Sequence, residues 1–127
     1  MSSLFDTSTR ALEKSMDLYL TRHNVIADNI ANAETPYFKA RQVEFESELQ
    51  RAVASEEQGL AGIDIENVRP VVFQDADSEQ GQDLNSVDMD REMARMTKND
   101  IQYSAATQMI SKKFALLKYA ISGGNDR

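Results

Sequence analysis

Two long stretches, one near each end of the chain, carry mostly hydrophobic residues at alternating spacings of four and three. The N-terminal stripe consists of Phe5, Thr9, Leu12, Met16, Tyr19, His23, Ile26, Ile30 and Ala33. The C-terminal stripe consists of Met89, Met93, Met96, Asp100, Tyr103, Thr107, Ile110, Phe114, Leu117 and Ile121. A repeat of about 3.5 residues places each set on one side of a helix that packs against another at a shallow angle. The pattern predicts helices of about 25 and 34 residues, about 37 and 50 Å long.

The segment between the two stripes is marked by residues that interrupt helices. Both prolines and three of the five glycines lie between residues 36 and 81. Thr35-Pro36 predicts the end of the first helix, because proline disfavours the α conformation in the residue before it. Residues 85–88 offer several N-cap candidates for the last helix,. We therefore expect residues 1–35 and 85–124 to form one assembly core and residues 36–84 to form an irregular acidic middle segment.

The predicted fold class is mainly α, with the terminal helices packed as an antiparallel coiled-coil-like pair. Within the middle segment, residues 45–53 have the pattern of a short amphipathic helix, and Val71-Val72-Phe73 is a candidate short β element,. If Ala33 lies near Met89, the numbers of facing residues sum to about 122, as in a coiled-coil register. His23 then lies near Asp100 as a polar pair at one level of the seam. The alternative is that these two residues face solvent or another subunit.

The apolar stripes predict assembly with other chains. A helix pair leaves flanking apolar residues uncovered, among them Leu18 and Val25 in the first helix and Met109 in the last. Since ordering the backbone costs about 1–2 kcal/mol per residue, we expect the isolated chain to be partly disordered at its ends. The expected assembly seam consists of Leu12, Met16, Tyr19, Ile26, Ile30, Met93, Met96, Tyr103, Ile110, Phe114, Leu117 and Ile121.

Charge and composition limit the possible partners and chemistry. The formal net charge is −7, and residues 55–90 carry ten acids against Arg69 alone. This acidic middle argues against nucleic acid as a partner, because phosphate binding requires clustered Lys and Arg. There is no cysteine and only one histidine, His23, so we expect no zinc site,. We expect no metal, no cofactor and no direct membrane insertion, and we expect the protein not to be an enzyme.

One motif lies where the first helix is expected to end. It consists of Asn29, Ile30, Ala31, Asn32, Thr35, Pro36 and Tyr37. The two asparagines can hydrogen-bond neighbouring backbone groups, and Thr35-Pro36 turns the chain. The stretch resembles the N-I-A-N-x-x-T-P signature of bacterial flagellar rod and hook proteins. Tyr37 departs from the glycine that many relatives carry after Thr-Pro.

A second motif opens the last predicted helix. The run Asn85-Ser86-Val87-Asp88-Met89-Asp90-Arg91-Glu92 resembles the N-x-V-D-x-D-x-E run of the same family. The two motifs lie in the expected order near opposite ends of the chain. The short length, together with residues 39–45, resembles one short proximal-rod member of the family, and the other short proximal-rod member is the nearest alternative.

The resemblance implies a structural subunit of the flagellar basal-body rod, the shaft that crosses the periplasm and links the MS ring to the distal rod and hook. Family members are exported by the flagellar type III apparatus without a cleaved signal peptide. The implied partners are copies of the chain, other rod proteins, the rod–MS-ring adaptor, the MS-ring protein and the export apparatus. The alternative function is a cytoplasmic helical adaptor or secretion chaperone that uses the same seams to hold a client.

Overall fold

The computed structural model describes residues 6–76 and 80–123. In chain order its elements are α1 (Thr7–Ala31), β1 (Arg41–Glu44), α2 (Glu46–Glu57), a short 3-10 helix η1 (Ile65–Asn67), β2 (Val71–Gln74) and α3 (Met89–Ile121). The expected ends of the two terminal segments, residues 1–5 and 124, lie outside the described residues. Two long terminal helices and a middle with a short helix and short strands confirm the predicted fold class.

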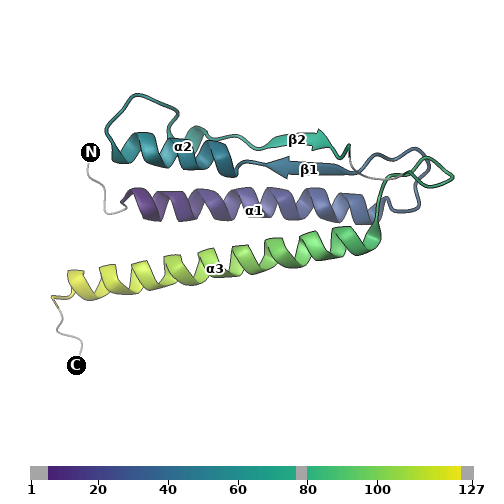
Figure 1. Cartoon of the computed structure of the whole chain (residues 1–127). Coiled ribbons are helices and arrows are strands. Elements are labelled where there is room, and N and C mark those ends of the chain that lie inside the picture. Colours follow the sequence, from purple (N-terminus) through teal and green to yellow (C-terminus); the bar gives the residue numbers. More distant parts are fainter. Residues whose placement is uncertain (1–5, 77–79, 124–127) are drawn as a thin grey trace.

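The elements form three layers, with α1 in the centre (Figure 1). The helix α3 runs antiparallel along one side of α1, while α2 and β1 pack on the other side and β2 pairs with β1 (Figure 1). Toward its C-terminal end, α3 diverges from α1 and continues past the first turn of α1 (Figure 1). The loops before β1 and before α3 lie together at the opposite end of the molecule (Figure 1).

Each long helix begins at an aspartate that caps it. The Asp6 carboxylate accepts a hydrogen bond from the backbone N–H of Thr9 at 2.8 Å, and the Asp88 carboxylate accepts one from Arg91 at 3.2 Å. Such side chains satisfy backbone donors that have no partner within the helix. The predicted cap region at residues 85–88 is thus confirmed.

The first helix ends at Ala31, earlier than the Thr35-Pro36 stop expected from the sequence. The Asn32 side chain donates a hydrogen bond to the backbone oxygen of Asp28 at 2.9 Å, and Asn32 itself is the C-cap. The following residues, 32–37, form turns rather than a last helical turn. The helix therefore ends at the asparagine of the motif, and the proline lies in the turn that follows.

The middle segment is more ordered than an irregular connection. The predicted short helix is present as α2, and the predicted strand at residues 71–73 is present as β2. The strand β1, which the sequence pattern did not indicate, pairs antiparallel with β2, with Val43 opposite Val72. The four-residue length of β1 is too short for a convincing alternation of polar and apolar residues,.

The main hydrophobic cluster lies between α1 and the middle segment. It consists of Leu18, Val43, Phe45, Leu49, Ala52, Ile65 and Val68. Leu18 is only 2% exposed, so the expectation that other chains must cover it was wrong. The helix α1 has a second apolar side, and α2 with β1 covers that side within the same chain.

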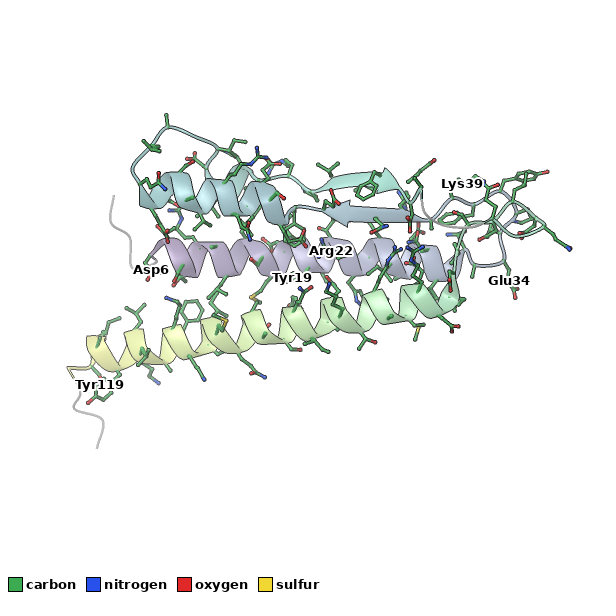
Figure 2. The ribbon with its side chains drawn as sticks, in the orientation of Figure 1. Asp6, Tyr19, Arg22, Glu34, Lys39 and Tyr119 are labelled. Atoms are coloured by element: carbon green, nitrogen blue, oxygen red, sulfur yellow. The ribbon has the colours of Figure 1, made fainter. Side chains whose placement is uncertain are left out.

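Aromatic and cationic groups close the cluster beside α1. The Tyr19 and Phe45 rings meet edge to face with centroids 5.5 Å apart, and the Arg22 guanidinium lies 4.5 Å from the centre of the Phe45 ring,. Figure 2 shows Tyr19 and Arg22 near the middle of α1. Burial raises the pKa of the Tyr19 hydroxyl,.

Candidate assembly interface

The expected seam residues lie at very different depths. In α1, Ile26 is buried, and Leu12, Met16, Tyr19 and Ile30 are half-buried. In α3, Ile110 is buried, Met96, Tyr103 and Leu117 are half-buried, and Met93, Phe114 and Ile121 are exposed. The α3 side that faces α1 instead centres on Glu92, Asn99, Ala106 and Ile110. Two of these four side chains are polar, which is why a hydrophobic pattern could not find them.

The register of the helix pair agrees with the one expected from the sequence. His23 Nδ1 and Asp100 Oδ1 lie 3.0 Å apart, within hydrogen-bond distance, as the predicted polar pair requires. The Asn99 side chain donates a hydrogen bond to the backbone oxygen of Tyr19 at 2.8 Å. Both His23 and Asp100 remain partly accessible to solvent, so this pair lies at the edge of the seam.

A buried polar junction joins the two sequence motifs. Asn29, which is fully buried, donates hydrogen bonds to the Glu92 carboxylate at 2.9 Å and to the backbone oxygen of Arg41 at 2.8 Å. Its side-chain oxygen accepts a hydrogen bond from the Arg41 N–H at 3.0 Å. One side chain of α1 thus fixes both α3 and the start of β1.

The Glu92 carboxylate is part of a longer chain of charged groups. It accepts a hydrogen bond from Arg95 at 2.8 Å, and Arg95 also donates to Asp75 at 2.8 Å. Glu92 and the Asp75 side chain are almost completely buried, so their charges depend on these partners,. The arrangement connects α3 to the end of β2.

The turns after α1 and before α3 are bound to each other by Asn85. Its side chain donates to the backbone oxygens of Asn32 and Thr35 at 2.8 and 2.6 Å. Nearby, the Ser86 hydroxyl accepts a hydrogen bond from the Ala40 N–H at 2.8 Å. The conspicuous polar residues of both motifs therefore hold the corner of the fold together.

The other motif residues lie on the outside of this corner. Ala31, Pro36 and Tyr37 are exposed, and Tyr37 is 70% exposed. Tyr37 also has a φ of 65°, in the left-handed region that favours glycine, and so does Leu84 at 61°,. The left-handed backbone at position 37 gives a physical reason for the glycine of the family pattern.

At the other end of the molecule, Arg10 ties α1 to the middle segment. Its guanidinium donates to the Glu66 carboxylate at 2.7 and 2.8 Å and also to Glu56. The Arg10 hydrogen bonds lower the pKa of the Glu66 carboxyl. These contacts position η1 and the end of α2 against the first turns of α1.

The helix α3 presents an uncovered apolar surface. Its exposed large apolar side chains include Ile101, Met109, Leu116, Tyr119 and Ile121. Leu116 and Ile121 are 69% and 70% exposed, and both lie in the part of α3 that diverges from α1 (Figure 1). Clustered apolar exposure of this kind marks protein-binding surfaces.

Several curated proteins that are similar to this chain are named flagellar basal body rod protein FlgB. The chain is 33% identical to FlgB of Bacillus subtilis (strain 168), over 96% of this chain and 98% of that protein. The chain belongs to the FlgB family. Identity is 32% with FlgB of Borrelia hermsii, over 94% of this chain, and 27% with FlgB of Salmonella typhimurium, over 98% of it. No protein-family model matches the sequence.

Membership of the FlgB family confirms the resemblance inferred from the two motifs. The FlgB relatives are matched over nearly their whole length, so the corner and both terminal helices fall within the shared region. Among the described residues, no helix is long and apolar enough to cross a membrane.

The acidic residues after β2 are the part of the sequence that most resembles a metal-binding loop,. The acidic run at residues 75–79 has the spacing of a calcium loop opening, but Asp77 and Glu79 lie outside the described residues,. Asp75 instead accepts a hydrogen bond from Arg95. Within the described residues, no group of His, Asp or Glu side chains has the arrangement of a metal site.

Proposed function

We propose that this chain is a structural subunit of the proximal part of the flagellar rod, the drive shaft that links the MS ring to the distal rod and hook. The observation that carries the proposal is the uncovered apolar surface of α3 in a member of the FlgB family. A self-contained protein of this size gains little from leaving Ile101, Leu116 and Ile121 in water. Neighbouring subunits in a shaft would cover them.

The proposed partners are copies of the chain, other rod proteins, the rod–MS-ring adaptor and the MS-ring protein. In this proposal residues 1–35 and 85–124 form the assembly core, and residues 36–84 lie outside it. The proposed seam between subunits includes Leu12, Met16, Ile30, Met93 and Phe114. The chain would reach the periplasm-spanning rod through the flagellar type III export apparatus, without a cleaved signal peptide.

The location of the protein in cells tests the proposal. Basal bodies purified from cells that express the chain should contain it, and washed cytosol should be depleted of it. A cytoplasmic helical adaptor or secretion chaperone would give the reverse distribution. Recovery in the cytosol alone, bound to an export client, would therefore overturn the rod assignment.

A substitution on the exposed face gives a second test. Ile101 is 64% exposed, so Ile101→Glu should leave the stability of the free chain nearly unchanged,. In the rod, however, it would bury an unpaired charge, which costs several kcal/mol. We expect Ile101→Glu to abolish swimming and incorporation into basal bodies, while Ile101→Ala retains both. Normal swimming of Ile101→Glu would contradict a buried role for this face.

A further inference from the structure

The two ends of the molecule carry opposite charges beside exposed apolar side chains. We define the tip as residues 33–39 and 80–90, and the tail as residues 111–123, which include the last part of α3. The tip holds four acids (Glu34, Asp83, Asp88 and Asp90) against Lys39. The tail holds three lysines (Lys112, Lys113 and Lys118) and no acid.

The tip and the tail cannot meet within one molecule. They lie at opposite ends of α3, whose 33 residues span about 50 Å,. Figure 2 shows Glu34 and Lys39 at one end of the molecule and Tyr119 at the other. Any contact between tip and tail must therefore join two chains.

The tail is a largely exposed helix end. It lies where α3 diverges from α1, and it exposes Leu116, Tyr119 and Ile121 to solvent (Figure 1). Lys113 forms an ion pair with Asp6 at 3.4 Å, whereas Lys112 and Lys118 are exposed. The tip offers exposed apolar groups of its own, Tyr37 and Leu84, next to its acids.

The charges of the tip and the tail indicate which surface binds the tail. Two tails would bring lysines together, and two tips would bring acids together, and both arrangements cost free energy. A tail against a tip pairs opposite charges and covers apolar groups on both sides. We propose that the tail of one copy docks on the tip of a second copy, so that subunits join head to tail.

A head-to-tail contact is heterologous, with different surfaces on the two partners. Each joined copy leaves one free tip and one free tail, so the contact repeats and generates an open-ended assembly. This contact rests on the proposed function, because it would join successive subunits along a shaft.

Charge reversal at each end tests the proposal on the purified full-length chain. The tip variant is Glu34→Lys with Asp90→Lys, the tail variant is Lys112→Glu with Lys118→Glu, and a combined variant carries all four changes. Lys98→Glu, an exposed reversal on α3 between the two ends, is the matched control. Association is measured by sedimentation velocity at low ionic strength, where charge effects are least screened.

We expect the wild type and Lys98→Glu to form concentration-dependent oligomers beyond the dimer. The tip variant and the tail variant should each associate about tenfold more weakly, because like charges then face each other. The combined variant, and an equimolar mixture of the tip and tail variants, should regain association because opposite charges meet again.

Several results would overturn the head-to-tail contact. These are a wild-type chain that stays monomeric, single-end variants that associate as tightly as wild type, and a combined variant that does not recover. Detection in purified basal bodies is the separate readout for the rod assignment. If the chain is present in basal bodies but its association is insensitive to charge reversal at both ends, the rod assignment stands and the head-to-tail contact is wrong.

Discussion

At the residue scale, Asn29 has the most consequential set of contacts. Its amide makes three hydrogen bonds in a site without solvent, to the backbone of Arg41 and to the Glu92 carboxylate. A buried carboxylate with too few partners is costly, so Glu92 depends on Asn29 and Arg95 for its solvation,. The asparagine of the motif is thus a requirement of this corner of the fold.

Replacing this amide should destabilise the chain. We expect Asn29→Ala to lower the free energy of unfolding by about 2–4 kcal/mol, because it leaves Glu92 and Arg41 groups without a partner. Asn24→Ala, at an exposed position of the same helix, is the control and should change stability by less than about 0.5 kcal/mol,. Urea unfolding followed by circular dichroism measures both. Equal effects of the two substitutions would refute a special role for Asn29.

Tyr37 pays a backbone penalty that glycine would avoid. Its φ of 65° costs a residue with a Cβ atom about 1–2 kcal/mol,. We expect Tyr37→Gly to leave the free energy of unfolding unchanged or to raise it by up to about 1 kcal/mol, since glycine is also more flexible when unfolded.

The control at this position is Tyr37→Ala, which removes the same ring but keeps the Cβ atom. The Tyr37 N–H donates to the backbone oxygen of Asp83 at 3.0 Å, and neither substitution removes this backbone donor. Thermal unfolding should therefore rank Tyr37→Gly above Tyr37→Ala. The opposite ranking would show that the left-handed backbone carries no strain here.

At the element scale, the N-terminal cap of α1 should make stability depend on pH. Hydrogen bonds from Thr9 lower the pKa of the Asp6 carboxyl from 3.8 to about 2. Because the folded pKa is the lower one, this stabilisation is complete above pH about 4 and is lost as the pH falls toward 2,. We expect Asp6→Asn, whose amide oxygen can still cap the helix, to flatten the dependence of unfolding free energy on pH in this range. The comparison is made by urea unfolding from pH 5 to pH 2, and identical pH slopes in the two proteins would argue against the cap.

Helices were the elements that the sequence revealed best. The 4-3 spacing predicted α1 and α3, since a long apolar repeat is a strong signal over many turns. Their register was assumed from placing Ala33 near Met89, and the contact between His23 and Asp100 agrees with that assumption. The strand β1 escaped prediction because four residues carry little pattern. The side of α3 that faces α1 was rotated from the expected one, because Glu92 and Asn99 occupy it through hydrogen bonds that hydropathy cannot register.

The candidate site was predictable only in part. The motif asparagines could be recognised as a helix end, but their partners could not, because Asn29 and Asn85 reach residues far away in sequence. The second apolar side of α1, with Leu18, was recognised as apolar and assigned to other chains. Only three-dimensional packing showed that α2 and β1 cover it.

At the scale of the whole molecule, the tail of α3 should be its least stable helical part. Few neighbours cover it, and a helix end without packing is marginal in water. We expect dilute protein to show less helix by far-ultraviolet circular dichroism than α1, α2 and α3 together would give, with helicity rising as the concentration rises. Full helicity at every concentration, with one cooperative melting transition, would contradict the expectation that the tail is partly unfolded in dilute protein.

The junction of Asn29 and Glu92 also has a consequence for the order of folding. The two residues are 63 positions apart, so their hydrogen bond closes a long loop and cannot form from the first helix alone,. A polypeptide threaded N-terminus first through a narrow channel would emerge without the partner for its corner. The native corner could then close only after Glu92, and with it more than two thirds of the 127 residues, had left the channel.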